Sequence, residues 1–262
     1  MPVAIITGAS KGLGRALAEG LAERGWDLVL DARTAPVLKE AARGLEPYGT
    51  KVVALPGDVT DAGHRADLVA AARELGGLDL LVNNASALGA EPLVALAELG
   101  LAGLRAALET NVVAALGLVQ EGLGLLRAAP AGAVVAVSSD AAAEAYGTWG
   151  GYGASKAALD QLAAVLAVEE PGLRVWAVDP GDMRTDLYAA AVPDDDSGRP
   201  EPSAVVPGFL RLLDERPPSG RYGAPALVAG REAGGVDGRA QAGPPGDRAQ
   251  TDPGGGRGEA GR

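Results

Sequence analysis

The sequence predicts a doubly wound α/β fold, a three-layer domain whose largely parallel sheet has about seven strands. Short apolar runs of strand length alternate along the chain with longer, Ala- and Leu-rich segments of helical period. The order strand, helix, strand recurs, and right-handed crossovers then place helices on both faces of one sheet. Ligands of such folds bind at the carboxyl ends of the strands.

The individual elements are predicted from the same alternation. Strands are expected at the short apolar runs 3–7, 27–31, 51–56, 78–83, 132–138, 173–179 and 221–228. Helices are expected over 13–24, 35–46, 61–75, 101–128 and 152–169. Gly25, Gly76 and Pro171 supply stops after three of these helices. Residues 1–228 are therefore predicted to form one domain, large enough to bury its own core.

Two C-terminal segments depart from the alternation. Residues 183–218 are rich in Pro and Asp and follow the sixth strand, so we predict a substrate lid there, with a solvated surface loop as the alternative. Residues 229–262 consist mainly of Gly, Arg, Pro, Ala and Asp and contain no Leu, Ile, Phe, Tyr or Trp. Such a tail cannot bury a core and is predicted to be disordered.

Composition and charge exclude several classes of function. The formal net charge of −11 argues against nucleic acid or an anionic membrane as the partner. Cysteine is absent and His64 is the single histidine, so we predict no metal site, no cysteine nucleophile and no Ser-His-Asp hydrolase. The chain also lacks a long apolar run and a basic leader segment, and we expect a soluble, cytoplasmic protein.

A glycine-rich turn follows the first strand. Gly8 permits a tight turn, Gly12 lets backbone amides approach a pyrophosphate, and Gly14 lets the next helix pack closely on the strand. The N-terminus of that helix offers unpaired N–H groups to an anion. The turn therefore predicts a Rossmann-type nucleotide site, and an ordinary glycine-rich βα turn is the alternative.

The end of the second strand bears on the choice of cofactor. In the register that we prefer, Ala32 stands where an acidic residue would read the adenosine ribose of NAD. Arg33 then faces a 2′-phosphate, with Lys11 as a second cation, which favours NADP. A register shifted by one residue would let Asp31 bond the 2′-hydroxyl instead, so NAD is not excluded.

Tyr152 and Lys156 form the candidate catalytic pair. Their spacing of four residues places the phenol and the ammonium on one helical face. A free tyrosine has a pKa near ~10, and an adjacent ammonium favours the phenolate. The pair therefore predicts an acid–base catalyst whose pKa is drawn toward neutral pH. A solvent-exposed Tyr and Lys on a helix surface is the alternative.

Together these motifs resemble those of the short-chain dehydrogenases/reductases over residues 3 to about 228. The resemblance rests on TGASKGLG at 7–14, Asp58-Val59, Asn83-Asn84-Ala85, Asn111, Ser139, the Tyr152/Lys156 pair and Pro180-Gly181 followed by Thr185. The family usually follows Asn-Asn-Ala with Gly, whereas this chain has Ser86.

The resemblance implies an NAD(P)-dependent oxidoreductase that transfers a hydride between the nicotinamide, preferably of NADPH, and a carbonyl or alcohol substrate. Tyr152 would be the general acid or base and Lys156 its partner. Ser139 would bond the substrate oxygen, and Asn111 would hold a water that links Lys156 to solvent. A homodimer or homotetramer is also implied.

The resemblance further implies a set of cofactor-binding residues. They would be Gly8, Ser10, Lys11, Gly12, Leu13, Gly14, Arg33, Asp58, Val59, Asn83, Ala85, Tyr152, Lys156, Pro180, Gly181 and Thr185. Alternatives stay open for three residues: Asp58 would cap helix 61–75, Asn111 would satisfy backbone groups in a bent helix, and Thr185 would cap the segment after it. Two other functions fit the same fold, a catalytically silent NADP-binding regulatory protein and an epimerase or lyase.

Overall fold

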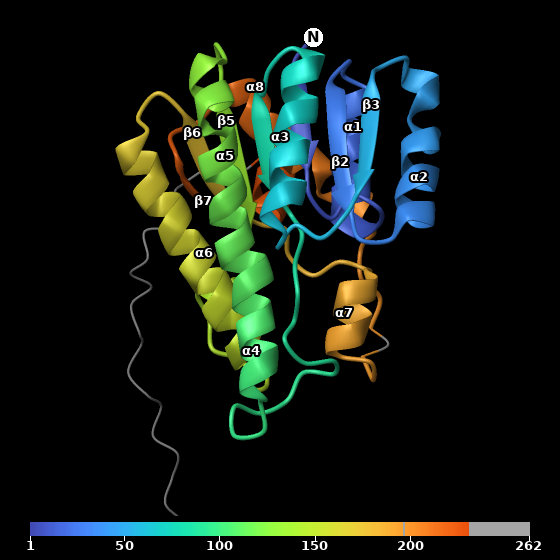
Figure 1. Cartoon of the computed structure of the whole chain (residues 1–262). Coiled ribbons are helices and arrows are strands. Elements are labelled where there is room, and N and C mark those ends of the chain that lie inside the picture. The colour runs from blue at the N-terminus through green and yellow to red at the C-terminus, as the bar shows by residue number, and fades with distance from the viewer. Residues whose placement is uncertain (196, 231–262) are drawn as a thin grey trace, which may run out of the picture.

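The computed structural model describes residues 1–195 and 197–230 and has a seven-stranded, all-parallel sheet (Figure 1). The strands are β1 (Val3–Ile6), β2 (Asp27–Ala32), β3 (Val52–Pro56), β4 (Leu80–Asn83), β5 (Ala133–Val137), β6 (Arg174–Asp179) and β7 (Gly220–Gly223). Their order in the sheet is β3-β2-β1-β4-β5-β6-β7. The chain thus winds outward in one direction from β1 and then in the other, which confirms the predicted doubly wound fold. The switch point between β1 and β4 is where such folds bind ligands.

The main helices cover both faces of the sheet. One face carries α1 (Gly12–Ala22), α2 (Ala35–Gly44) and α8 (Val206–Glu215), and the other carries α3 (Ala62–Leu75), α5 (Ala114–Ala128) and α6 (Gly150–Glu169). Side chains on each strand alternate between the two layers, as Ile5 and Ile6 do in β1. Both layers are apolar, which suits parallel strands that are buried on both sides.

Shorter elements complete the described chain. They are the helices α4 (Leu101–Leu108), α7 (Asp186–Ala191) and α9 (Ala224–Val228), the 3₁₀ turns η1 (Glu46–Tyr48), η3 (Asp140–Ala142) and η4 (Pro202–Ala204), and the π-helical segment η2 (Glu109–Val113). Figure 1 shows α7 standing beyond the carboxyl edge of the sheet, near the loop that follows β4. This arrangement places α7 over the edge at which ligands are expected.

Two predicted elements at the end of the domain differ from the structure. The strand predicted over 221–228 ends at Gly223, and α9 follows it, because Pro225 cannot donate to a sheet ladder but fits the first turn of a helix. Residues 206–215 were predicted to belong to a lid, but α8 buries Phe209 and Leu212 in the core. The predicted disordered tail lies, from residue 231 onward, outside the described residues.

The helix predicted over 101–128 is continuous but changes its winding at η2. By length and composition the run Leu101–Ala128 could cross a membrane. Its α5 part, however, places Leu118 and Leu126 in the core and packs against α3, as a helix that covers a sheet does. The π-helical step lies where Asn111 bonds to the loop after β4, and such steps often occur at functional sites.

Candidate active site

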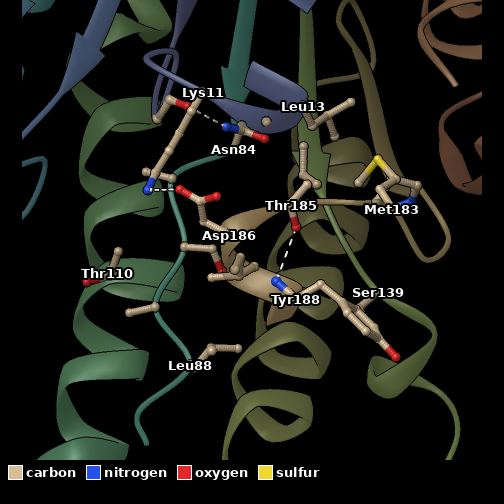
Figure 2. Close-up of a pocket in the computed structure, with 18 of the residues that line it drawn as sticks. Lys11, Leu13, Asn84, Leu88, Thr110, Ser139, Met183, Thr185, Asp186 and Tyr188 are labelled. Atoms are coloured by element: carbon tan, nitrogen blue, oxygen red, sulfur yellow. Dashed lines mark hydrogen bonds and ion pairs between the residues drawn. The ribbon is translucent and has the colours of Figure 1, made fainter. Parts of the chain in front are cut away.

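A cavity of about 330 Å³ opens at the carboxyl ends of the strands. Its walls are the glycine-rich turn, the segments that follow β2 to β6, the start of α6, and α7. Figure 2 shows part of this lining, from Lys11 in the turn to Tyr188 in α7. Every predicted site residue lines it except Gly14, Asn83 and Asn111. The fold therefore brings the sequence motifs together in one cleft, although they come from segments far apart in the chain.

The glycine-rich turn has the geometry of an anion cradle. Gly8 and Gly12 have φ angles of +64° and +56°, a region that side chains other than glycine rarely adopt. Gly14 lies behind the turn, where an added Cβ would be 2.4 Å from the Gly8 carbonyl oxygen. The residue that precedes α1, Lys11, makes no side-chain cap, so the first amides of α1 are left for a ligand.

Asn84, rather than the predicted Asn83, lies on the cleft. Its Nδ2 donates to the Thr7 carbonyl oxygen at 2.8 Å, and its backbone N–H donates to Thr7 Oγ1 at 3.0 Å. Asn83 is buried and turns toward α5, where its Nδ2 donates to the Ala115 carbonyl oxygen at 3.4 Å. The Asn-Asn pair did not reveal which amide faces the ligand, because that depends on the strand's alternation.

The end of β2 fixes the side chains of Asp31 and Arg33. Asp31 is 2% exposed and its Oδ1 lies 2.6 Å from His64 Nε2. β2 ends at Ala32, and Arg33 is exposed and lines the cleft. Within the described part of the chain Arg33 takes part in no ion pair. A guanidinium is therefore available at the cleft, while the Asp31 carboxylate is engaged.

Asp58 does not cap the helix that follows it. The residue that caps α3 is Asp61, whose Oδ1 accepts from the Gly63 backbone N–H at 2.6 Å. Asp58 Oδ1 accepts from the backbone N–H and the hydroxyl of Thr60, and these bonds hold the pKa of Asp58 below its usual range. An ionised acceptor therefore stands on the cleft beside Val59.

The segment after β6 meets the glycine-rich turn across the cleft. Lys11 Nζ lies 2.5 Å from Asp186 Oδ2, and both side chains are largely exposed (Figure 2). Thr185 Oγ1 accepts from the Tyr188 backbone N–H at 3.1 Å, so Thr185 caps α7 while its side chain also lines the cleft. The start of α7 is thus tied to the turn by one solvent-screened ion pair.

Tyr152 and Lys156 lie together in the first two turns of α6, which begins two residues earlier than predicted. Lys156 Nζ is 5.5 Å from the centre of the Tyr152 ring and donates to the Val137 carbonyl oxygen at 2.8 Å. Both side chains are buried and both line the cleft. The predicted alternative of a solvent-exposed pair is therefore wrong.

The pKa of Tyr152 differs from the sequence-based expectation. Burial raises it to about 12, with the charges of Asp179 and Asp140 adding to the effect and a hydrogen bond with Ser86 opposing it. Burial also lowers the pKa of Lys156 to about 8, opposed by the charge of Asp160. Burial disfavours the charged form of each group, and for Tyr152 the ammonium 5.5 Å from the ring centre does not outweigh this effect. Tyr152 is therefore protonated at neutral pH.

Replacing Lys156 with methionine is expected to raise the free energy of unfolding at pH 7 by about 1–2 kcal/mol, because the substitution removes a buried cation. Loss of the hydrogen bond to Val137 offsets only part of this stabilisation. The pKa of Lys156 is about 8 in the folded protein and 10.5 ordinarily, so the unfolded chain binds more protons between these values. Wild-type stability therefore rises with pH in this window, and the variant's advantage should shrink from pH 8 to pH 10.

Denaturant titrations at several pH values would measure this difference. Lys39→Met serves as the control because Lys39 is exposed and should give little change. A Lys156→Met variant that is no more stable than wild type at pH 7, or whose advantage grows with pH, would contradict the expectation.

Ser139 and Asn111 hold different positions relative to the cleft. Ser139 lines it, and its Oγ donates to Asp140 Oδ1 at 3.0 Å. Asn111 is buried behind the wall, where its Nδ2 donates to the Ala87 carbonyl oxygen and to Ser155 Oγ, and its Oδ1 accepts from the Ala87 N–H. The side chain of Asn111 thus ties η2 to the loop after β4 and to α6, and these partners lie outside its own helix, unlike those of the alternative in which it satisfies backbone groups in a bent helix.

Arg221 supports the cleft from β7 and was not found from the sequence. Its Nη2 donates to the Ser139 carbonyl oxygen at 2.8 Å, and its Nε donates to Asp160 Oδ2 at 3.0 Å. Asp160 Oδ2 also accepts from Ser138 Oγ at 2.8 Å. The contacts fix the end of β5 against α6. The run Gly220–Gly223 offered no signal for this role, since the role depends on contacts with α6 and with the end of β5.

The far half of the cleft is apolar and acidic. Trp149, Tyr188, Leu88 and Met183 line it, and the rings of Trp149 and Tyr152 meet edge to face with centroids 5.7 Å apart. Tyr146 is exposed and lies outside it. Three carboxylates line this half, those of Asp140, Asp179 and Asp182, and burial raises the pKa of Asp179.

Known proteins are similar to this chain in sequence and in fold. The family profile described as short chain dehydrogenase matches residues 2–196. A cis-4-hydroxycyclohexanecarboxylate dehydrogenase of Sinomonas cyclohexanicum is 37% identical over 195 residues, 73% of this chain and 77% of that protein. The glycine betaine reductase ATRR of Emericella nidulans is 36% identical over 188 residues, 71% of this chain but only 15% of that longer protein. A solved structure of a short-chain dehydrogenase of Shigella flexneri, complexed with NADP, matches this chain with a TM-score of 0.80 at 29% identity. The match covers 86% of this chain and 97% of that one.

Proposed function

The chain belongs to the short-chain dehydrogenase family, an oxidoreductase family, and from that premise we propose that it reduces an uncharged ketone or aldehyde with NADPH. The observation that carries the proposal is the shared cleft. The buried Tyr152/Lys156 pair and the glycine-rich turn line the same cavity, so a proton donor stands within one site with an anion cradle. NADP is bound by the Shigella flexneri relative, which supports the same cofactor here.

The residues at the turn and at the end of β2 fit the nucleotide half of NADPH. The uncapped amides of α1 and the left-handed Gly8 and Gly12 would hold the pyrophosphate. The guanidinium of Arg33, which is in no ion pair among residues 1–195 and 197–230, would hold the 2′-phosphate, because Arg presents several donors to phosphate oxygens. Asp58 would accept from the adenine amino group, since its carboxylate is ionised and faces the cleft.

The remaining lining residues fit the chemistry at a carbonyl group. When bound, NADPH supplies the hydride. Tyr152, protonated at neutral pH, would donate its proton to the carbonyl oxygen as the alcohol forms, and Ser139 would hydrogen-bond the same oxygen. Lys156 would stabilise the phenolate that is left and contact the nicotinamide ribose. Asn111 would act as a positioning residue through Ser155 and Ala87.

A titration with NADPH and NADH, followed by a panel of carbonyl compounds, tests the proposal. We expect NADPH to bind more tightly than NADH and its absorbance to fall when a substrate is added. Tight binding without loss of that absorbance for any carbonyl would favour a regulatory protein. Conversion of a substrate with no net change in absorbance would favour an epimerase or lyase. Either result would contradict the proposed reductase.

The acidic lining predicts discrimination against anionic substrates. Acetophenone and 4-acetylbenzoate present similar rings and differ by one carboxylate. We expect kcat/KM to be higher for acetophenone, because Asp140 lines the far half of the cleft and would repel a carboxylate there, whereas Asp179 and Asp182 pair with Arg221 and Arg199. If the protein reduces both ketones with equal kcat/KM, the acidic lining does not discriminate against anionic substrates.

We further propose that residues 183–195 and 197–204, without α8, form a substrate lid that the Lys11–Asp186 contact ties to the nucleotide half of the cleft. Asp186→Asn is then expected to lower the Kd of NADPH about two- to fivefold, because Lys11 is released toward the 2′-phosphate and a nearby negative charge is lost. The Kd of NADH should change little. Asp67→Asn, at an exposed carboxylate on α3, controls for the change in net charge. Equal effects of the two substitutions on NADPH would rule out the Lys11–Asp186 contact as the cause.

A homodimer or homotetramer is proposed as the working form in the cytoplasm. Its support is the exposed apolar side chains on α5 and α6, among them Leu116, Val165 and Val168. Sedimentation velocity would show a dimer or tetramer if this is right and a monomer at all concentrations if it is wrong.

A further inference from the structure

His64, the single histidine, lies behind the nucleotide half of the cleft. It is the third residue of α3, and its ring nitrogen Nε2 is 2.6 Å from Asp31 Oδ1. The side chains of His64 and Asp31 are 11% and 2% exposed. Asp31 lines the cleft, whereas His64 is not among the lining residues in the described chain. The imidazole therefore binds the carboxylate from the side away from the ligand.

Gly57 makes room for this imidazole. A Cβ at residue 57 would lie 2.3 Å from His64 Nδ1 and 2.4 Å from its Cε1. The φ angle of Gly57 is not in the left-handed region, so the backbone does not itself require glycine. Its N–H donates to the Ala32 carbonyl oxygen at 3.1 Å, which continues the pairing of β3 with β2. Because Gly57 has no Cβ, the imidazole of His64 can lie beside it and contact Asp31.

The acidic residues around Asp31 would repel a 2′-phosphate if His64 did not hold the Asp31 carboxylate. Asp31 and Asp58 both line the cleft, together with the cation Arg33. Burial raises the pKa of Asp31 and the charge of Asp58 adds to this, whereas His64 and a backbone hydrogen bond with Gly8 lower it. A carboxylate turned toward the ligand would repel the phosphate and accept a hydrogen bond from a 2′-hydroxyl.

We propose that His64 is a specificity-determining residue for the cofactor: by holding the Asp31 carboxylate against α3, it keeps that carboxylate from the adenosine ribose and favours NADPH over NADH. The inference rests on the proposed NADPH function. His64 acts through Asp31 and does not itself contact the cofactor.

The test is a set of Kd values for NADPH and NADH, measured at pH 8 by quenching of intrinsic fluorescence. His64→Leu is expected to raise the Kd of NADPH about tenfold and to leave the Kd of NADH equal or lower, because the released carboxylate turns to the cleft. His64→Gln retains a side-chain N–H donor and should keep a ratio of Kd values close to that of wild type. Asp31→Asn combined with His64→Leu should restore the NADPH Kd.

Gly57→Ala gives an independent route to the same result if His64→Leu does not fold. The added methyl group displaces the imidazole without removing it, so NADPH binding should weaken and Asp31→Asn should again restore it. Unchanged Kd ratios in folded His64→Leu or Gly57→Ala protein would overturn the inference. Equal weakening of both cofactors, or a loss that Asp31→Asn does not restore, would also overturn it. Failure of wild-type protein to bind either cofactor would instead overturn the proposed function.

Discussion

Replacing Tyr152 with phenylalanine is expected to lower kcat for carbonyl reduction by about 10²- to 10⁴-fold, the usual contribution of a positioned general acid. The substitution removes one hydroxyl from a side chain that is 6% exposed and leaves the ring packed against Trp149. The substrate oxygen would then gain negative charge without a proton donor. Because the ring stays in place, the Kd of NADPH should remain within about twofold of the wild-type value.

The control for this variant is Tyr146→Phe. Tyr146 is 41% exposed, bonds to Glu144 and lies outside the cleft, so its replacement should leave kcat unchanged. Steady-state rates at saturating NADPH would be compared for the wild type and both variants. A Tyr152→Phe enzyme that keeps more than about a tenth of the wild-type kcat would exclude Tyr152 as the proton donor.

Replacing Arg33 with alanine is expected to raise the Kd of NADPH by about 10- to 100-fold, the effect of losing hydrogen bonds to a charged group. Arg33 is exposed at the end of β2 and is in no ion pair within the described residues, so its guanidinium is free to bind a phosphate. NADH has no 2′-phosphate, and its Kd should change little. The preference for NADPH should therefore largely disappear.

Lys39→Ala is the matched control, since Lys39 is exposed on the neighbouring helix α2 and does not line the cleft. It removes the same net charge and should affect neither cofactor by more than about twofold. If Arg33→Ala weakens NADPH and NADH equally, Arg33 supports the fold of the site rather than reading the phosphate. The predicted register at the end of β2 would then be wrong.

The doubly wound parallel sheet was predictable because the chain repeats a strand and a helix. The apolar runs gave each strand from β1 to β6 to within two residues, since parallel strands buried on both faces are apolar throughout. The last strand was harder to predict from the sequence, because Gly220–Gly223 contains few apolar residues and the apolar residues that follow it form α9. Only the position of Pro225 indicated that a helix, and not a strand, follows Gly223.

The candidate site was predictable where one motif fixes one local geometry, as in the turn at 8–14 and the Tyr152/Lys156 spacing. It was not predictable where contacts join distant segments. The bonds of Arg221 to Asp160 and Ser139, and of His64 to Asp31, span strands or helices that the sequence does not place in register. The pKa of Tyr152 also escaped prediction, because it depends on burial and not only on the nearby ammonium.

Single-turnover mixing is the most direct test that the cleft couples a bound NADPH to a proton from Tyr152. Wild-type protein and the Tyr152→Phe variant, each loaded with one equivalent of NADPH, would be mixed with a ketone that the wild type reduces. We expect the wild type to consume its NADPH and form an equal amount of alcohol, while the variant in the same time keeps its NADPH bound and unchanged. Equal rates of NADPH loss in the two proteins would contradict this expectation.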